Sequence, residues 1–552
     1  MDKQARKMNF TIIDCTLRDG GYYNNWQFDK ELAIAAIKAL NRARIDIIEV
    51  GYKAPRSHIS KTFEGLFRFC PESQLQFLKE YTQAQYSFMI DAKEFIQGGH
   101  ADFSLLKGSL LPEKDSVFHW VRVATYFKTY NQAIELAKNL KDMGYKVTIN
   151  LMGISLLSQS DVIRALKQTN HEDVDVFYFA DSFGNLQSND IIQYISLIRE
   201  YFSGKIGIHT HDNQGLAFAN TLTALEGGVD FFDATIMGMG RGSGNLNTEQ
   251  FLLYSYFRLN EKKRNPKELL DVIDTYFAPL HQEYKWGWDY TYMLGALQNI
   301  HPSYCQSLKI NKQYSLEQVT QIFNAVDTSK RSKYDETILL KAIDLAMNQI
   351  DSTEKTELLD LPLYHPVEGD TFLVIGAGPF ANNYREEIIT FIRQFNPVVI
   401  ECHPKNLSFE KISQQYIVAI LNWARLKNNL DEFPHMSRSI VTGLESVSAS
   451  YANKANLFKI PCQISRGNLS IAKESFILPA YFVGMFAVSL ALLSKPRTIY
   501  LAGFDGYEND SHPIHQEMNL FWKAIQEKLS SLISLTPTTY SLSTTPIFSI
   551  IQ

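Results

Sequence analysis

The chain is poor in the features that mark several large protein classes. It has five cysteines in 552 residues, scattered and without a Cys-x-x-Cys pair, and an odd number of thiols does not fit a closed disulfide framework. Its 54 basic and 59 acidic side chains give a formal net charge of -5, so there is no basic surplus to hold a phosphate backbone. We therefore expect a cytoplasmic protein that does not bind nucleic acid.

Long apolar runs are also scarce. The N-terminal MDKQARKMNF has no apolar segment behind it of the length that a signal peptide needs. One stretch, FILPAYFVGMFAVSLALL at 476–493, has 18 residues without a charge, which is near the lower limit for a membrane span. Because Pro479 lies near its start and the strand-like RTIYLAGFD follows, we interpret it as a buried helix that leads into a sheet, and we predict no membrane span.

What is present is ordinary globular material, with 45% hydrophobic and 20% charged residues. Single hydrophobic cores stop growing at roughly 250–300 residues. A chain of 552 residues therefore predicts at least two domains.

The first part of the chain repeats one theme, a short β-rich run followed by a longer amphipathic stretch. The amphipathic stretches include DKELAIAAIKALNRA (29–43) and NQAIELAKNLKDMGY (131–145), whose apolar residues recur at helical spacing. Eight such units predict a closed parallel (β/α)8 barrel, the TIM-barrel fold. The eight β-rich runs are 10–16, 45–51, 86–90, 119–125, 146–152, 175–181, 206–212 and 231–238.

Polar side chains lie at the ends of these predicted strands, where the functional groups of such a barrel gather. In IGIHTHD the two histidines are two residues apart, so both imidazoles point to the same face of a strand. The other polar residues at or near strand ends are Arg18, Asp19, Glu49, Arg122, Asn150 and Asp181. We expect Glu49, Arg122, Asn150 and Asp181 to bind substrate.

Two neutral imidazoles and one carboxylate are a common ligand set for a divalent metal with open positions. His209, His211 and Asp19 supply that set across the predicted barrel mouth. The glycine-rich loop GMGRGSGNLNTEQ at 238–250 follows the eighth strand, and its Asn245 could offer a carbonyl oxygen as a further ligand. The pattern therefore predicts a metal centre.

Arg18 stands next to the predicted metal carboxylate Asp19 in IIDCTLRDGG. Neither charge can be buried alone without a large cost. We expect Asp19 to bind the cation, and Arg18 to bind a substrate carboxylate or the enolate oxygen that develops when a bond next to a carbonyl breaks.

The motifs DCTLRDGG, HTHDNQGLAFANTLTALEGGVD and GMGRGSGNLNTE resemble those of the metal-dependent aldolases and lyases related to hydroxymethylglutaryl-CoA lyase and isopropylmalate synthase. HWVRVAT and the general layout are most similar to 4-hydroxy-2-oxovalerate aldolases. The resemblance covers about residues 8–310. It implies that Asp19, His209 and His211 ligate Mn²⁺ or Mg²⁺, with Asn245 near the metal, and that Arg18 stabilises a pyruvate-type enolate.

The chain departs from this family's pattern at two places. Where the aldolases carry a histidine shortly after the Arg-Asp pair, this chain has Gly21 and Tyr22, so Tyr22, Tyr23 or a metal-bound water would act as the general base. The lyases carry a catalytic cysteine in the loop after the eighth strand, and GMGRGSGN has none. Cleavage of hydroxymethylglutaryl-CoA is therefore disfavoured.

Helical material follows the barrel, and WGWDYTYMLGALQNIHPSYCQ at 286–306 resembles the segment that closes the aldolase site. It offers His301, Tyr290 and Tyr304 as candidates for catalysis, of which we select His301. Aromatic clusters in such segments usually serve packing. We predict a barrel over 1–265, a helical extension and connector over 266–365, and a second domain over 366–552.

The second domain begins with TFLVIGAGPFANNYREEIITFIRQFNPVVIEC, a strand, glycine turn, helix and strand. Gly376 and Gly378 fit the loose dinucleotide-binding fingerprint, and Asp505 ends a later strand. The pattern favours a Rossmann-like domain with phosphate at the helix start after Gly378. It resembles sialyltransferase-like and MptE-like domains, which implies a nucleotide or sugar nucleotide ligand and a role in bacterial surface polysaccharides. A dehydrogenase-type dinucleotide site and a sheet used only for packing or dimerisation are the alternatives.

Together these features predict an aldolase that cleaves or forms a carbon–carbon bond of a 4-hydroxy-2-oxo acid, with a 2-oxo acid and an aldehyde as partners, in a homodimer. One alternative is a Claisen-type synthase that uses an acyl-CoA. The other is a non-catalytic sugar-nucleotide-binding protein with a relic barrel, against which the intact Asp19, His209 and His211 argue.

Overall fold

We describe the protein from a computed structural model. The structure describes residues 9–55, 64–106, 110–311, 314, 316–348, 358–404, 409–421, 423–432, 439–444, 446–452, 454–465, 467–480, 482–506, 513–529 and 531–551. The expectations for residues 1–8, for the first part of the connector (351–357) and for the end of GFDGYEND (507–510) lie outside these ranges.

The chain divides into two compact units, Met1–Asp335 and Glu336–Gln552. The N-terminal unit therefore holds both the barrel and most of the helical segment that the sequence analysis treated as a separate extension. The division falls about 30 residues before the boundary expected at 366, because the helix Glu336–Asn348 (α15) belongs to the C-terminal unit.

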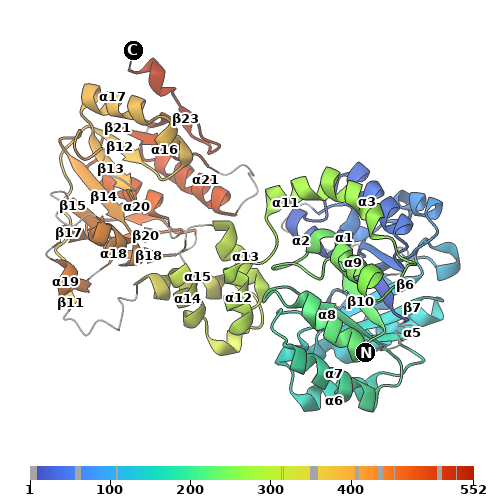
Figure 1. Cartoon of the computed structure of the whole chain (residues 1–552). Coiled ribbons are helices and arrows are strands. Elements are labelled where there is room, and N and C mark those ends of the chain that lie inside the picture. Colours follow the sequence, from blue (N-terminus) through green and yellow to red (C-terminus); the bar gives the residue numbers. More distant parts are fainter. Residues whose placement is uncertain are drawn as a thin grey trace. The chain divides into compact units, whose positions relative to one another are not determined.

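The N-terminal unit is a closed barrel of eight parallel strands (Figure 1). The eight β-rich runs of the sequence each supply one strand, so the predicted fold class is confirmed. The order around the barrel is β1, β10, β9, β8, β7, β6, β3 and β2. The strands are β1 (Thr11–Asp14), β2 (Ile47–Tyr52), β3 (Gln85–Asp91), β6 (Trp120–Thr125), β7 (Lys146–Leu151), β8 (Val176–Asp181), β9 (Lys205–Thr210) and β10 (Phe231–Ala234).

Helices cover the outside of the barrel because their apolar residues lie on one face. The first of them, α3, begins where the Asp29 carboxylate accepts the backbone N–H groups of Glu31 and Leu32, which is a normal N-cap. The outer helices are α3 (Lys30–Arg42), α5 (Tyr130–Asp142), α6 (Gln159–Gln168), α7 (Ser188–Tyr201), α8 (Ala217–Glu226) and α9 (Thr248–Arg258).

Short helices connect the strand ends, and a helical segment follows α9. The first strand, β1, is shorter than the predicted range 10–16, because the chain enters the helical turn α1 at Thr16. The helices of this unit outside the outer ring are α1 (Thr16–Asp19), α2 (Gly21–Asn24), α4 (Leu66–Phe69), α10 (Leu270–Val272), α11 (Ala278–Tyr284), α12 (Tyr290–Leu297), α13 (Pro302–Asn311) and α14 (Leu316–Ala325).

Alternation along each strand separates the barrel interior from the outer core. The interior holds a small apolar cluster that includes Ile13, Tyr178 and Phe231, whereas their neighbours Ile12 and Phe232 pack in the outer core. Residues two positions from an interior residue face the interior as well. This parity decides which of the polar strand residues can meet.

The C-terminal unit is built on an open sheet of eight strands, all parallel, in the order β17, β15, β14, β13, β12, β21, β22 and β23. The order reverses direction between β12 and β21, the usual place of a ligand crevice in such sheets. The strands are β12 (Thr371–Ile375), β13 (Val398–Cys402), β14 (Tyr416–Ile420), β15 (Ser439–Thr442), β17 (Asn456–Lys459), β21 (Thr498–Ala502), β22 (Leu532–Ser534) and β23 (Ser543–Thr544).

Two separate hydrophobic clusters cover the two faces of this sheet. One includes residues of α17 (Arg385–Phe395) and α18 (Trp423–Glu432), and the other includes residues of α20 (Val483–Leu493) and α21 (Pro513–Gln526). A small sheet of β18 (Cys462–Ile464), β19 (Ser470–Ile471) and β20 (Phe476–Leu478) and the pair β11 (Leu358–Asp360) and β16 (Ser446–Ser448) complete the unit. The helices are α15, α16 (Pro379–Asn383), α17 (Arg385–Phe395), α18 (Trp423–Glu432), α19 (Ala449–Ala452), α20 (Val483–Leu493) and α21 (Pro513–Gln526).

The uncharged stretch 476–493 is the strand β20 followed by the helix α20, whose residues from Met485 to Ala491 are buried. The chain then enters β21. Among the described residues, no helix is both long and apolar enough to cross a membrane. The interpretation as a buried helix that leads into a sheet is confirmed for the described part of this stretch.

Candidate functional site

The three predicted metal ligands come together at one end of the barrel. Asp19 is the last residue of α1, directly after β1, and His209 and His211 lie at the end of β9. One ligand atom from each lies within 4.8 Å of the other two, and all three residues are buried. His209 Nε2 lies 4.0 Å from Asp19 Oδ2. A group of this composition and spacing suits one divalent cation.

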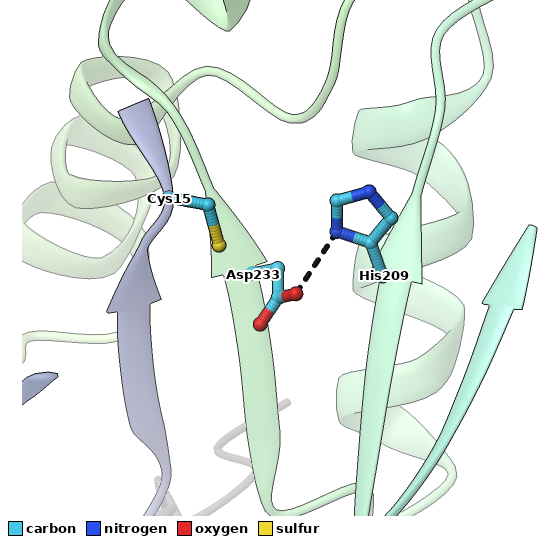
Figure 2. Close-up of side chains that lie close together, drawn as sticks. All are labelled: Cys15, His209 and Asp233. Carbon is cyan, nitrogen blue, oxygen red and sulfur yellow. Dashed lines mark hydrogen bonds and ion pairs between the residues drawn. The ribbon is translucent and has the colours of Figure 1, made fainter. Parts of the chain in front are cut away.

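The Nδ1 atoms of both imidazoles are occupied by hydrogen bonds. His211 Nδ1 lies 3.3 Å from the carbonyl oxygen of Gly244, which can only accept, so Nδ1 carries the proton. His209 Nδ1 lies 2.9 Å from Asp233 Oδ2 (Figure 2). Since Arg122 and His209 lower the pKa of the buried Asp233 to about 2 against the effect of burial, Asp233 is an ionised acceptor. Both rings thus use Nδ1 for a hydrogen bond, which leaves Nε2 as the atom that can face a metal.

The charge state of the ligands also suits a cation. Burial, followed by the neighbouring His209, lowers the pKa of His211 to about 3, so this imidazole is neutral at pH 7. Burial opposes the ionisation of Asp19, but Arg18 and the two histidines outweigh it and hold its pKa well below its usual range. The side-chain oxygen of Asn245 is buried without a hydrogen-bond partner, while its Nδ2 donates to Asp19 Oδ2 at 2.6 Å. An orphaned oxygen beside the carboxylate fits a fourth ligand.

A series of buried hydrogen bonds between charged side chains connects Asp19 to His209. Arg18 donates through Nη1 to Asp19 and through Nε to Glu49 Oε2 at 2.7 Å. Arg122 donates to the same oxygen of Glu49 at 3.0 Å and to Asp233 Oδ2 at 2.6 Å. The series Asp19, Arg18, Glu49, Arg122, Asp233, His209 therefore alternates in hydrogen-bonding role from one metal ligand to another. Each buried charge has an opposite partner, which such burial requires.

A second group of candidate ligands, Cys15, His209 and Asp233, shares one histidine with the first (Figure 2). Burial, followed by the charges of Asp233 and Glu49, raises the pKa of the Cys15 thiol well above its usual value, which disfavours the thiolate that a metal would need. Asp233 is already paired with Arg122. Asp19, His209 and His211 are therefore the better candidates for a metal group, with Asp233 as the acceptor that orients the His209 ring.

The loop after β10 closes over this group. The side chain of Asn213 accepts the backbone N–H of Ser243 at 2.9 Å and donates to the carbonyl of Phe183 at 2.9 Å, so it connects the loops after β8 and β10. A Cβ at Gly240 would lie 2.5 Å from Asp19 Oδ2. Only glycine allows the backbone to pass this close to the carboxylate.

Strand parity divides the expected substrate-binding residues. Glu49, Arg122 and Asn150 face the barrel interior, where Asn150 accepts the hydroxyl of Thr148 at 2.7 Å. Asp181 lies three positions after the interior residue Tyr178 on β8, and an odd spacing along a strand directs its side chain away from the interior. Its carboxylate accepts the backbone N–H groups of Asn185 and Leu186. The structure therefore places Asp181 in the turn before α7, away from the interior residues Glu49, Arg122 and Asn150, and its role in substrate binding stays a prediction.

The two tyrosines proposed as general bases have different surroundings. The Tyr22 hydroxyl lies 3.0 Å from the hydroxyl of Tyr52. The Tyr23 hydroxyl donates to the Gly242 carbonyl at 2.8 Å, and its ring packs beside Tyr284 and Trp286. Because burial also raises the pKa of Tyr23 above its usual range, this phenol is a poor base. Tyr22 is the better of the two.

The three candidates from the aromatic segment after the barrel, His301, Tyr304 and Tyr290, also differ in their surroundings. His301 lies beside Phe183 with ring centroids 5.9 Å apart, and its Nδ1 accepts the backbone N–H of Ser303 at 3.3 Å. Burial lowers its pKa to about 3, so it is neutral and carries its proton on Nε2. Tyr304 is buried against Tyr334, and Tyr290 is 49% exposed. Tyr304 therefore serves packing.

Sequence reasoning overlooked Asp233 and Arg241. Asp233 stands between Phe231 and Thr235 in the apolar FFDATIMG, and a charge inside a buried strand is a signal that it has a partner. Arg241, in the loop after β10, lies with its guanidinium carbon 5.7 Å from the centre of the Tyr22 ring. Only the folding of that loop over the barrel brings it to the site.

In the C-terminal unit, Gly376 and Gly378 follow β12 at the point where the sheet order reverses. Asp505, after β21, accepts the backbone N–H of Phe380 at 2.9 Å. A Cβ at Gly378 would lie 2.6 Å from both the Asp505 carboxyl carbon and the Gly503 carbonyl oxygen. The chain's own carboxylate thus takes the place expected for a phosphate, at the start of the five-residue helix α16. Close packing accounts for the glycine.

A pocket lies beside this turn at the carboxyl ends of β12 and β13. Its lining includes Gly376, Gly378, Arg385, Glu401 and His403. Glu401 lies near the end of β13, close to the position that a ribose-binding acid takes in dinucleotide-binding folds. In this structure its carboxylate accepts a hydrogen bond from the Tyr416 hydroxyl.

Comparison with known proteins places the barrel in a family. The HMGL-like family model matches residues 116–275. The chain is 27% identical over 249 residues to a 4-hydroxy-2-oxovalerate aldolase of Geobacillus genomosp. 3, a match that covers 45% of this chain and 70% of the relative. It is 26% identical over 238 residues to an oxaloacetate decarboxylase of Mycobacterium tuberculosis, covering 43% of this chain and 67% of that protein.

A solved structure agrees with this placement. The N-terminal domain of a "putative aldolase" from Bacteroides vulgatus is 34% identical to this chain, with a TM-score of 0.50. The match covers 55% of this chain and 97% of that domain. Through its barrel, with the carboxylate and two histidines gathered at one end, the chain belongs to the HMGL-like family of carbon–carbon lyases.

Proposed function

We propose that the chain is a divalent-metal-dependent aldolase that cleaves or forms a carbon–carbon bond of a 4-hydroxy-2-oxo acid through a pyruvate-type enolate. The observation that carries this proposal is the group of Asp19, His209 and His211, in which both Nδ1 atoms are already occupied. The names of the aldolases that match the barrel agree with it.

Asp19, His209 and His211 would hold Mn²⁺ or Mg²⁺, with the orphaned Asn245 oxygen beside them. A divalent ion in this place supplies Lewis acidity, which polarises the 2-oxo group and stabilises negative charge on its oxygen. The protein contributes a dry and rigid surrounding, because each ligand is buried and hydrogen-bonded.

Arg18 is the residue we assign to the enolate oxygen. Its Nε and Nη1 are committed to Glu49 and Asp19, and within the described ranges of the chain Nη2 has no hydrogen-bond partner. The guanidinium is therefore fixed in orientation while one donor stays available. A preorganised donor beside a developing oxyanion is the arrangement that stabilises such a transition state.

In the cleavage direction the C3–C4 bond breaks and the 4-hydroxyl proton leaves as the aldehyde forms. The electron pair stays on C3 as the enolate, which then takes up a proton to give the 2-oxo acid. We assign the transfer of the 4-hydroxyl proton to Tyr22, whose hydroxyl oxygen accepts it while its own proton passes to C3, so that Tyr22 carries no net change. The Tyr52 hydroxyl, 3.0 Å away, orients this group, and His301 stays neutral and offers its Nε2–H as a hydrogen-bond donor.

The test is release of pyruvate from a panel of 4-hydroxy-2-oxo acids with and without Mn²⁺. We expect metal-dependent release by the wild type and none by Asp19→Ala or His209→Ala. His171→Ala changes an exposed histidine outside the site and should leave the rate unchanged. Metal binding without pyruvate release from any member of the panel would overturn the aldolase assignment, and failure to bind metal would overturn the catalytic one.

Oxaloacetate decarboxylation is a second candidate, favoured by the match to a decarboxylase. Loss of CO₂ from oxaloacetate gives the same pyruvate enolate, so the same residues would serve. Oxaloacetate therefore belongs in the panel. A turnover that requires an acyl-CoA would instead indicate the Claisen-type synthase.

The sequence-based predictions of a nucleotide or sugar nucleotide in the C-terminal unit, of a surface-polysaccharide context, of a homodimer and of a cytoplasmic location stay predictions. The pocket beside Gly376 and Glu401 is the place to test the first of them. Titration of the full chain with nucleotides and sugar nucleotides, with Glu401→Gln as the comparison, is the direct measurement.

A further inference from the structure

Arg241 is a cation at the barrel mouth without a carboxylate partner. Its Nη2 donates to the Ser182 carbonyl at 3.4 Å, and its Nε is buried with no hydrogen-bond partner. No ion pair joins it to any Asp or Glu in the part of the chain that the structure describes. Arg18 and Arg122, by contrast, each pair with two buried carboxylates.

The backbone holds Arg241 next to the metal group. The preceding Gly240 passes so close that its Cβ would lie 2.5 Å from Asp19 Oδ2. The following Gly242 accepts the Tyr23 hydroxyl, and Asn213 holds the N–H of Ser243. The arginine is thus anchored on both sides, and its guanidinium lies over the Tyr22 ring, at the residue we assign to the 4-hydroxyl proton.

The groups around Arg241 are neutral or bound to other partners. His301 is uncharged, because its pKa is lowered first by burial and then by the charges of Arg241 and Lys93. Lys93 is paired with Asp91 at 2.6 Å. Asp19 is committed to Arg18 and Asn245. In the described residues, therefore, no carboxylate is hydrogen-bonded to the Arg241 guanidinium, although the charge of Asp19 acts on it.

A partly buried guanidinium without an anion is costly, and its planar fork matches carboxylate and phosphate groups. We propose that Arg241 binds an anionic group on the acceptor half of the substrate, a carboxylate or a phosphate, so that the enzyme takes 4-hydroxy-2-oxo acids with a second negative charge. This inference rests on the proposed function. In that function the metal group and Arg18 take the 2-oxo acid end, and Arg241 lies beside Tyr22, where the acceptor end begins.

The test compares substrates that differ only in this end. We would measure kcat/KM for pyruvate release from 4-hydroxy-2-oxopentanoate, from the corresponding 4-hydroxy-2-oxo-dicarboxylate, and from a terminally phosphorylated homologue. Arg241→Ala should lower kcat/KM for the preferred anionic substrate by about 30-fold or more, with less than about a threefold change for the uncharged one. Arg241→Lys should restore part of the loss, and Arg258→Ala, an exposed arginine on α9, should change nothing.

The two anionic substrates distinguish the source of the charge, since the carboxylate or the phosphate will show the larger loss. An equal loss for charged and uncharged substrates would overturn the proposal, because Arg241 would then hold the 2-oxo acid end or support the fold. The absence of any loss would overturn it as well.

A binding measurement separates this inference from the proposed reaction. Calorimetric titration of the Mn²⁺-loaded full chain with 2-oxoglutarate and with 2-oxobutanoate needs no turnover. If no substrate releases pyruvate but the wild type prefers the dianion and Arg241→Ala loses that preference, the aldolase assignment fails and the anion site stands. If the wild type shows no preference for charged ligands in either experiment, the anion site is wrong.

Discussion

At the residue scale, the two histidines are prepared for their role by different acceptors. His211 Nδ1 faces the backbone carbonyl of Gly244, and His209 Nδ1 faces the Asp233 carboxylate. A carboxylate is the stronger acceptor and raises the basicity of the ring it holds. His209 therefore depends on a side chain that never has to touch the metal.

Asp233→Asn should weaken Mn²⁺ binding by about 10- to 100-fold, because the amide holds His209 less firmly and leaves Arg122 without its charge partner. The measurement is Mn²⁺ titration followed by electron paramagnetic resonance, with circular dichroism to verify the fold. Asp142→Asn, on the exposed end of α5, is the control. Unchanged Mn²⁺ affinity in a folded Asp233→Asn variant would mean that Asp233 is only a partner of Arg122.

Asp181 predicts a pH effect on stability. Burial raises its pKa to about 7 in the folded chain, whereas an unfolded Asp titrates near 3.9. The folded state therefore binds more protons between these two values, so this group's contribution to stability is full below about pH 4 and declines as the pH rises through about 7.

Asp181→Asn removes this titration and can keep the turn hydrogen bonds from Asn185 and Leu186. We expect the wild type to lose more stability than the variant between pH 5 and pH 8, measured as the urea midpoint of the barrel. If the urea midpoints of the two proteins change equally with pH, Asp181 ionises normally.

At the element scale, the helical segment after the barrel is attached at Trp286. Its indole N–H donates to the Met237 carbonyl at 2.8 Å, and its ring packs at 4.8 Å against His281 and at 6.0 Å beside Tyr23. Only 3% of this tryptophan is exposed. Met237 lies in the loop that carries Arg241 and Asn245, so the attachment also supports the site.

Trp286→Ala should lower the free energy of unfolding of the N-terminal unit by about 3–5 kcal/mol, the usual cost of removing a large buried aromatic side chain. Trp288 offers a matched control two residues away, because it is 55% exposed, and Trp288→Ala should change stability by less than about 0.5 kcal/mol. Chemical unfolding followed by tyrosine fluorescence gives both values. Similar losses for the two variants would contradict this attachment.

At the scale of the whole molecule, each unit has its own hydrophobic core. The barrel has one large outer cluster, and the C-terminal sheet has a cluster on each face. All the residues of the proposed metal and substrate site belong to the N-terminal unit. We therefore expect the N-terminal unit to carry that site by itself.

A chain of residues 1–335 should fold, bind Mn²⁺ and release pyruvate with kcat/KM within about threefold of the full chain. The match of a separately solved N-terminal domain, 97% of which this chain covers, agrees with an N-terminal unit that folds by itself. Pyruvate assays and Mn²⁺ titration of both chains are the measurements. A folded truncated chain that binds metal but does not release pyruvate would assign the second unit a direct role in turnover.

The sequence by itself determined the barrel and the meeting of Asp19, His209 and His211 at one end of it. The eight apolar runs form strands because each is short, β-rich and followed by an amphipathic helix, and both patterns are local. His209 and His211 share a face because residues two apart in a strand always do. Asp19 joins them since the ends of parallel strands meet at one edge of a barrel.

Only the tertiary structure decided the partners of these groups. The outward direction of Asp181, the acceptor role of Asp233 and the approach of Arg241 to Tyr22 depend on strand parity and loop closure between segments up to about 220 residues apart. The same holds for Asp505, which occupies the helix start where a phosphate was expected. Local patterns fix which residues share a face, but the contacts that assign a charge its partner form only when distant loops pack together.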